Sequence, residues 1–392
     1  MLAQWKRHFL VVAAFILIYY CVFRDTLNSS YHGLISSFSS LGPANSTLGF
    51  GAVYVVSGLN SPRRFGLVQA ANVTGIDLTI PTQPIWTDHD ERKFYEDGFG
   101  NITTTTGSIR AWLAHDSVLQ EFIDSGHETA LILEDDVDWD IRLRTMQIPR
   151  AAAAIRSYSD RFAPNPRLSP RRPRAASSYY GDTSAWDLLY IGHCGDYFDA
   201  VEQYGVDRTI SPSELATTNH TFYADATLIP RSDLHPFTAQ LFNELHITEH
   251  IRMVHQSVWP LCTFGYAVTR AAAIKIHARV APPKATHEAF DVAMLHACRA
   301  GAADGLRCVT VNPELFHHME GESIISQQNP DPMGIPPVDF AGLEQTMERG
   351  ETSNIGCGFW SGDFDFDEDF ERLGYLRKEV AGKGRCLKPG RG

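Results

Sequence analysis

The stretch Gly107–Val137 reads GSIRAWLAHDSVLQEFIDSGHETALILEDDV and joins a helical pattern to a strand pattern. Apolar residues recur at helical spacing over Ser108–Ser125, and Ala130–Leu133 is a short apolar run. Further strand patterns lie at Ala52–Ser57 and Leu188–Ile191. Short strands that alternate with helices predict an α/β fold with a largely parallel sheet.

Three acids, Glu134, Asp135 and Asp136, directly follow the apolar run. In an open α/β sheet, ligands bind beyond the carboxyl ends of the strands. Carboxylates two residues apart can share a hard divalent cation that also holds a diphosphate, so we expect a ligand site here. Two other acidic clusters are interpreted as solvated turns: Asp88 with Asp90, and the tail run Asp363, Asp365, Asp367 and Asp369.

A further acid, Asp291, lies on the apolar stripe of a helical pattern that begins near Thr286. Met294, Leu295 and Cys298 follow on the same face. A carboxylate in such a place requires a partner. Asp291 is therefore either a catalytic or substrate-binding residue, or a structural carboxylate favoured by the helix dipole or by a buried base.

Basic side chains occur near both ends of the predicted sheet segment. Arg63 and Arg64 follow the first strand pattern and either hold phosphate groups, lie in a solvated turn or form a structural ion pair. His317 and His318 follow a late strand pattern, where one of them could complete a metal site.

His115 shares a helix face with apolar residues and is interpreted as a hydrogen-bonded core residue. Core positions are also expected for Trp86 and Trp186.

The composition is that of a globular protein. The chain has 392 residues, 46 of them acidic and 34 basic, and a net charge of −12 with His neutral. Its hydrophobic fraction of 44% suffices for a core, and the acidic balance argues against nucleic acid as a partner. The motifs of P-loop ATPases, zinc proteases, serine hydrolases and dinucleotide-binding proteins do not occur in the sequence.

An unbroken apolar run, Phe9–Phe23, has Lys6 and Arg7 before it and Arg24 after it. As a helix its 15 residues span about 22 Å, less than a hydrocarbon core of about 30 Å, so it is either an anchor or part of a signal peptide. We expect the anchor, because bulky residues end the run and leave no signal-peptidase site. The basic flank then predicts a single-pass type II protein of the Golgi or endoplasmic reticulum membrane, with its body in the lumen.

Asn-X-Ser/Thr sequons support a lumenal body. About one or two are expected by chance in a chain of this composition. The sequence has five, and we expect N-glycosylation at Asn28, Asn45, Asn72, Asn101 and Asn219.

Six cysteines follow the predicted anchor and could form up to three disulfides in an oxidising lumen, with 15 possible pairings. They are Cys194, Cys262, Cys298, Cys308, Cys357 and Cys386.

Composition also divides the chain into segments. We expect a cytosolic tail at residues 1–8, a transmembrane anchor at 9–23, a flexible stem at 24–50, a folded body at 51–328 and a C-terminal extension at 329–392. Within the body, arginines among Pro and Ser residues over 163–178 predict a mobile basic loop.

Several blocks resemble glycosyltransferase family 25, which contains lipopolysaccharide and procollagen galactosyltransferases. The Gly-led helix with its His, followed by LILEDD, carries most of the resemblance. Further blocks follow the family's order: VYVVSGLNSPRR, WDLLYIG, GYAVTRAAAIKI, FDVAML, VNPELF and ESIIS. The likeness covers residues 52–326. It departs at Arg110, Ala111 and the Leu113–His115 segment, where the family commonly has Gly-Cys and Leu-Ser-His.

The resemblance implies a GT-A-like domain, with a mostly parallel sheet flanked by helices. It implies an enzyme that moves a sugar, typically galactose, from a nucleotide diphosphate donor such as UDP-galactose to a hydroxyl of a glycan or glycoprotein, with inversion. A divalent metal, Mn²⁺, held by Glu134 and Asp136 would neutralise the departing diphosphate.

Roles for the other candidates follow from the same chemistry. Asp291 matches the family's later acidic position and is the candidate base that accepts the acceptor's proton. Arg63, Arg64 and Asp135 are expected at the donor, the two arginines at its phosphates and Asp135 at its sugar or ribose. Two other classes stay open: a catalytically silent lumenal protein that binds glycans or nucleotide sugars, and a metal-dependent hydrolase.

Overall fold

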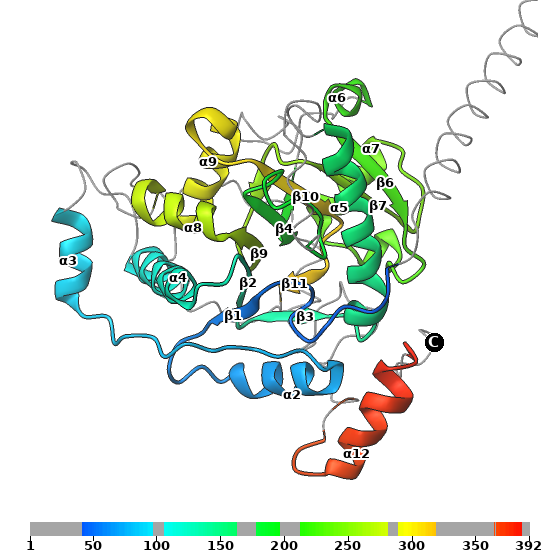
Figure 1. The fold of residues 1–392 in the computed structure, drawn as a ribbon, viewed down its shortest axis with the longest axis horizontal. Coiled ribbons are helices and arrows are strands. Elements are labelled where there is room, and N and C mark those ends of the chain that lie inside the picture. Colours follow the sequence, from blue (N-terminus) through cyan, green and yellow to red (C-terminus); the bar gives the residue numbers. More distant parts are fainter. Residues whose placement is uncertain are drawn as a thin grey trace, which may run out of the picture.

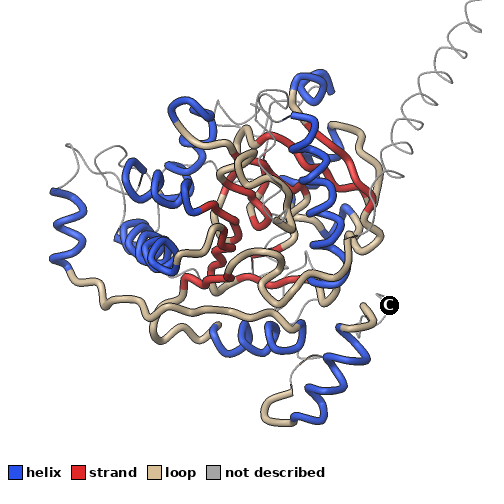
Figure 2. Tube along the Cα trace, viewed as in Figure 1, coloured by secondary structure: helices blue, strands red, loops and turns tan. Residues whose placement is uncertain are grey.

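The computed structural model describes residues 41–96, 106–162, 178–196, 212–280, 289–318, 364 and 366–385. In this part of the chain a central sheet lies between two layers of helices (Figures 1 and 2). The α/β class predicted from the sequence is therefore confirmed.

The strands of the sheet follow one path, and most of them run in one direction. The order is β1 (Ala52–Val56), β2 (Thr129–Glu134), β9 (Gly265–Thr269), β4 (Leu188–Gly192), β10 (Cys308–Asn312), β7 (Ile251–Gln256) and β6 (His220–Ala224). β7 and β9 are antiparallel to both of their neighbours, and the other five strands point the same way. The carboxyl ends of these five strands thus meet at one edge of the sheet, which is called the carboxyl edge below.

Short strands complete the sheet near the carboxyl edge. β11 (Phe316–His318) pairs with β3 (Val137–Trp139) and touches the end of β4. A separate two-stranded ribbon joins β5 (Gly195–Asp196) to β8 (Pro260–Leu261).

The apolar run of β2 explains why the sheet is central. Its side chains alternate between two faces, as they do in any strand. Leu131 and Leu133 belong to the hydrophobic core on one face, whereas Ala130 and Ile132 belong to the core on the other. A strand covered on both faces is expected to be continuously apolar, which is what the sequence shows.

Helices cover both faces. One core contains residues of α2 (Arg64–Thr74), α5 (Ile148–Phe162) and α12 (Phe370–Tyr375). The other contains residues of α4 (Thr106–Ser125), α8 (Arg270–Lys275) and α9 (Phe290–Asp304). The remaining helices are α3 (Asp88–Glu96), α6 (Pro212–Thr217) and α7 (Pro236–Glu244), with short helical turns at Leu143–Gln147, Arg231–Asp233, Ile276–Val280 and Leu376–Ala381.

Part of the C-terminal extension packs on α2. Phe364 and Phe366 are buried in the core on that face, and the Phe366 N–H donates to the side chain of Gln69 at 3.2 Å. Asp369 is exposed, as a solvated acid should be, but it caps α12 instead of lying in a plain turn, because it accepts hydrogen bonds from the N–H groups of Glu371 and Arg372. Asp363 and Asp365 lie outside the described residues.

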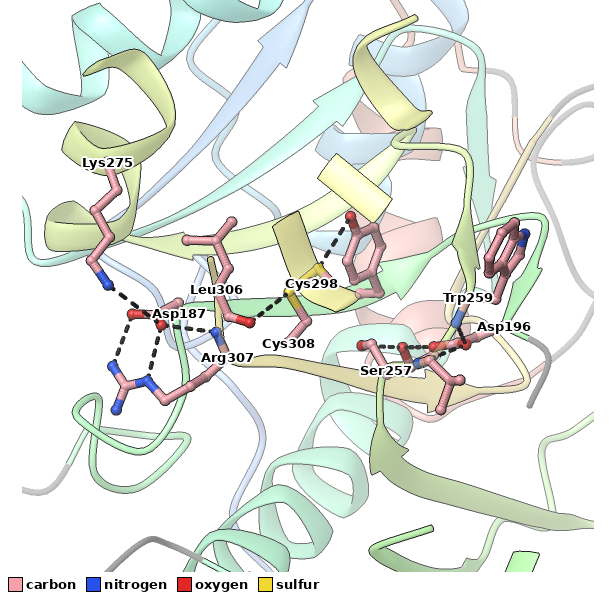
Figure 3. Close-up of a disulfide and its surroundings, with 12 residues drawn as sticks. Asp187, Asp196, Ser257, Trp259, Lys275, Cys298, Leu306, Arg307 and Cys308 are labelled. Carbon is pink, nitrogen blue, oxygen red and sulfur yellow. Dashed lines mark hydrogen bonds and ion pairs between the residues drawn. A yellow bond between two sulfur atoms is a disulfide. The ribbon is translucent and has the colours of Figure 1, made fainter. Parts of the chain in front are cut away.

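Two disulfides pair four of the six cysteines that follow the predicted anchor: Cys194 pairs with Cys262, and Cys298 pairs with Cys308. Figure 3 shows the second bridge, which fastens α9 to β10. Cys357 and Cys386 lie outside the described part of the chain.

The predicted sequons differ in their surroundings. Asn45 and Asn219 are exposed. Asn72 lies on α2, where its amide nitrogen donates to the Val68 carbonyl at 3.0 Å and its oxygen accepts from Arg377 at 3.2 Å. Asn28 and Asn101 fall outside the described ranges.

Among the residues that the structure describes, no helix has the length and apolar character to cross a membrane. The predicted anchor at residues 9–23 and most of the predicted stem lie outside them, as does most of the predicted basic loop at 163–178.

Candidate functional site

The three acids lie where β2 meets the carboxyl edge. Glu134 is the last residue of β2 and pairs with Val56 at the end of β1, while its N–H donates to the Phe264 carbonyl at 2.9 Å. Asp135 and Asp136 form the turn between β2 and β3. This placement agrees with the prediction that the apolar strand delivers its acids to a ligand-binding edge.

Asp135 is buried and held by protein groups on both oxygens. One oxygen accepts from the Ser57 hydroxyl at 2.6 Å, and the other accepts from Nε of Arg63 at 3.1 Å. Asp135 therefore fixes the loop after β1 against the end of β2.

The two arginines after β1 have different roles in this loop. Arg64 donates to the Ser57 hydroxyl at 3.2 Å and to the Gly58 carbonyl at 2.8 Å, so it folds the loop on itself. Arg63 faces the acids, with Nη2 lying 3.7 Å from Oδ2 of Asp136. Of the pair, Arg63 is thus the one placed to meet an anion at the carboxyl edge.

One carboxylate oxygen of Asp136 has a protein partner, and the other has none among the described residues. Oδ2 lies 3.4 Å from Nε2 of His318, whereas the buried Oδ1 has no hydrogen-bond partner among the described residues. Burial alone would raise the pKa of Asp136, but the hydrogen bond and charge of His318, together with Arg63, hold that pKa below its usual value. A buried ionised oxygen without a partner is a position where a cation fits.

His318 reaches this place through the antiparallel pairing of β11 with β3, which sets it opposite Val137. Burial opposes its protonation, yet the Asp136 carboxylate raises the pKa of His318. His317 instead bonds Oε1 of buried Glu314 at 3.2 Å. The burial cost at Glu314 is overcome by His317 and nearby histidines, which lower its pKa to about 2.

Asp291 lies at the start of α9, on the face of the sheet covered by α4. Its Oδ1 accepts from the Val292 N–H at 2.9 Å. Its pKa is raised, first by burial and further by the negative charge of Glu134. His115 lies 3.4 Å from Glu134 and stacks on Phe290, the residue before Asp291, so the fold brings these two acids, distant in sequence, to one region.

His115 is buried as predicted, with 2% of its surface exposed. Nδ1 lies 3.2 Å from the Tyr266 hydroxyl, and Nε2 lies 3.4 Å from Oε1 of Glu134. Its helical pattern gave no sign of the second contact. Trp186 is fully buried as predicted, while Trp86 is only partly buried.

The donor atoms at this edge fit a cation only in part. No group of three or more His, Cys, Asp or Glu side chains in the described ranges is arranged to hold a metal ion. Asp136 nevertheless offers one unpartnered carboxylate oxygen, Oδ1. Ions that bind nucleotides commonly use one or two protein carboxylates and take their remaining ligands from phosphate and water, so this carboxylate fits such an ion.

The chain matches no protein-family model, and no similar sequence was found among curated proteins.

Proposed function

We propose that this protein is a metal-dependent, inverting glycosyltransferase that moves a sugar, galactose, from UDP-galactose to a hydroxyl of a glycan or glycoprotein. The observation that carries the proposal is Asp136 at the carboxyl edge, whose Oδ2 faces Arg63 and His318 and whose buried Oδ1 has no hydrogen-bond partner among the described residues. Asp291 lies close enough to Glu134, at the same edge, to feel its charge. The resemblance to glycosyltransferase family 25 supports the same reaction.

The donor half of the proposed site consists of a cation-binding carboxylate and a fixed positive charge. Asp136 would hold the metal through its unpartnered Oδ1, with Glu134 as a further candidate ligand at the end of β2, and His318 would join only on releasing the proton that it shares with Asp136. When bound, a divalent cation neutralises the charge that develops on the departing diphosphate. Arg63 lies within 3.7 Å of Asp136 and would bind phosphate oxygens beside it.

The acceptor half requires a base, and Asp291 suits that role. A carboxylate whose pKa is raised by burial and by a like charge binds a proton more readily than a free one. At the start of α9 its Oδ1 accepts from the Val292 N–H at 2.9 Å. In the proposed reaction Asp291 takes the proton of the acceptor hydroxyl as the new glycosidic bond forms and the bond to the diphosphate breaks.

The departure from the family at Arg110 leaves these acids in place. Nε of Arg110 donates to Oε1 of Glu91 at 2.7 Å, which ties α4 to α3. The charge of Arg110 is thus engaged by a carboxylate outside the acidic end of β2.

We also propose a GT-A-like domain behind a type II membrane anchor, with residues after Arg24 in the lumen of the Golgi or endoplasmic reticulum. Two disulfides support an oxidising compartment, and the exposed sequons Asn45 and Asn219 support glycosylation there. Endoglycosidase treatment of the full-length protein from sealed vesicles tests this topology. We expect a mobility shift and protection from added protease, and a protein without a shift that is digested would overturn it.

The reaction is tested with the full-length chain in detergent and a panel of nucleotide sugars, with and without Mn²⁺. We expect Mn²⁺-dependent release of UDP from UDP-galactose and transfer to an acceptor from a glycan panel. Binding of nucleotide sugar without turnover would instead indicate the silent binding protein. Release of free sugar alone, with no acceptor product, would indicate a hydrolase.

A further inference from the structure

His115 joins three parts of the proposed site that are far apart in sequence. It projects from α4 and has one ring nitrogen at Tyr266 of β9 and the other at Glu134, the last residue of β2. Its ring also stacks on Phe290, with centroids 4.4 Å apart and an angle of 12° between the planes. Phe290 begins α9 and directly precedes Asp291.

The chemistry of these neighbours fixes the form of the imidazole. A carboxylate accepts hydrogen bonds but donates none, so a hydrogen bond to Oε1 of Glu134, 3.4 Å from Nε2, requires the proton on Nε2. In a neutral ring Nδ1 is then an acceptor, which matches a hydroxyl donor on Tyr266. The polar series therefore runs from the Tyr266 hydroxyl to Nδ1, and from Nε2–H to Oε1 of Glu134.

We infer that His115 is a positioning residue that fixes the location of Glu134 relative to the start of α9. This inference rests on the proposed function, because that relative position matters only if Glu134 and Asp291 belong to one site. The polar edge of the His115 ring orients the Glu134 carboxylate at the end of β2. The face of the ring packs on Phe290 and so positions Asp291, the neighbouring base.

Three substitutions separate these contacts. His115→Phe keeps an aromatic ring for Phe290 and removes both polar contacts. His115→Gln supplies a side-chain N–H that can replace the donor to Glu134. Tyr266→Phe removes only the hydroxyl that faces Nδ1. Val118→Ala is the matched control, since Val118 is buried on the same helix and belongs to the same core.

The measurement is Mn²⁺-dependent UDP release from UDP-galactose by the full-length chain, with the thermal midpoint recorded for each variant. We expect kcat to fall about 10- to 100-fold in His115→Phe, the usual range for groups that orient a functional side chain, and KM for the Mn²⁺-bound donor to rise, because Glu134 is also a candidate metal ligand. His115→Gln should recover part of that loss, and Tyr266→Phe should show a smaller fall. Val118→Ala should lose thermal stability and keep its kcat. A kcat that follows thermal stability across all four variants would overturn the inference.

Spectra of the protein with ¹⁵N-labelled histidine distinguish this inference from the proposed function. The His115 signal, identified by its absence in His115→Phe, should show the Nε2-protonated form in the parent and change in Tyr266→Phe. A parent protein with that signal but without UDP-galactose turnover would mean that the proposed function has failed. An active parent with the Nδ1-protonated form would mean that the positioning role has failed.

Discussion

Asp225 and Asp291 both lie at the carboxyl edge of the sheet, but their partners differ. Asp225 follows β6 and is fully buried, and its oxygens accept from Nε of Arg252 at 2.8 Å and from Arg150 at 3.1 Å. Thr227 adds donors from both its N–H and its hydroxyl. The cost of burial is outweighed by Arg252 and Thr227, and the pKa of Asp225 is lowered.

Asp291 has the opposite balance. Burial and the charge of Glu134 raise its pKa, against backbone hydrogen bonds at the start of α9 and the weaker influence of His115. A buried acid surrounded by cations is part of the framework, whereas an acid beside another acid is available for chemistry. We conclude that the partners of a carboxylate, more than its burial, indicate its role at this edge.

If carboxylates with an unpartnered oxygen bind ligands, substituting Asp136 should have the largest effect on donor binding. Asp136→Asn should abolish Mn²⁺-dependent binding of UDP-galactose, because the unpartnered oxygen loses the charge that attracts a cation. Calorimetric titration measures the loss, and an unchanged thermal midpoint shows that the fold is intact. Asp124→Asn, at an exposed acid on α4, is the control and should bind like the parent. Undiminished Mn²⁺-dependent affinity in a folded Asp136→Asn protein would count against the site.

Asp291→Asn should separate catalysis from binding. We expect UDP-galactose affinity to be retained and the transfer rate to fall about 10²- to 10⁴-fold, because an amide cannot accept the acceptor's proton. Single-turnover transfer together with donor titration checks both quantities. Asp116→Asn provides a control on the same side of the sheet, where Asp116 pairs with His277 at 2.7 Å. A variant that transfers at the parent rate would make Asp291 a structural helix residue, and one that loses donor affinity would place it in the donor site.

Asp225→Asn should affect stability instead. It leaves the Arg252 guanidinium, 1% exposed, without its ionic partner, and breaking such a pair costs about 3–5 kcal/mol. Urea unfolding followed by fluorescence measures the change. Arg150→Ala is the informative companion, because the side chain of Arg150 is 35% exposed and its pair with Asp225 should contribute at most about 1 kcal/mol. Equal stability of Asp225→Asn and the parent would show that this pair is dispensable.

Local patterns predicted the parts of the site that lie close together in sequence. The apolar run before Glu134 identified both β2 and its acids, and the apolar stripe around Asp291 marked it as an acid that needs a partner. His317 and His318 were equivalent in sequence. Only the pairing of β11 with β3 directs His318 to Asp136.

Contacts between distant strands left no pattern to detect. Arg252 reaches Asp225 from the neighbouring strand, and its Nη1 also donates to the carbonyls of Pro313 and Glu314 beyond β10. The antiparallel course of β9 was hidden for a similar reason. A strand buried on both faces is apolar whichever way it runs, so GYAVT carries no sign of direction.

The smallest effect, and the sharpest separation of the two acids, lies in the pH dependence of stability. The pKa of Asp225 is lowered in the fold, so its contribution is present above the unfolded pKa, about 3.9, and is lost as the pH falls through the folded value. The pKa of Asp291 is raised, so the folded state binds the extra proton and its stability declines as the pH rises from about 3.9 through the folded value.

The stability deficit of Asp225→Asn relative to the parent should therefore shrink on acidification. Asp291→Asn should gain stability relative to the parent as the pH rises toward neutrality, because the amide carries no charge to bury. Urea unfolding of the parent and both variants at a series of pH values between 3 and 7 measures the two differences. Slopes of the same sign would show that both acids are framework residues and that their partners do not set them apart.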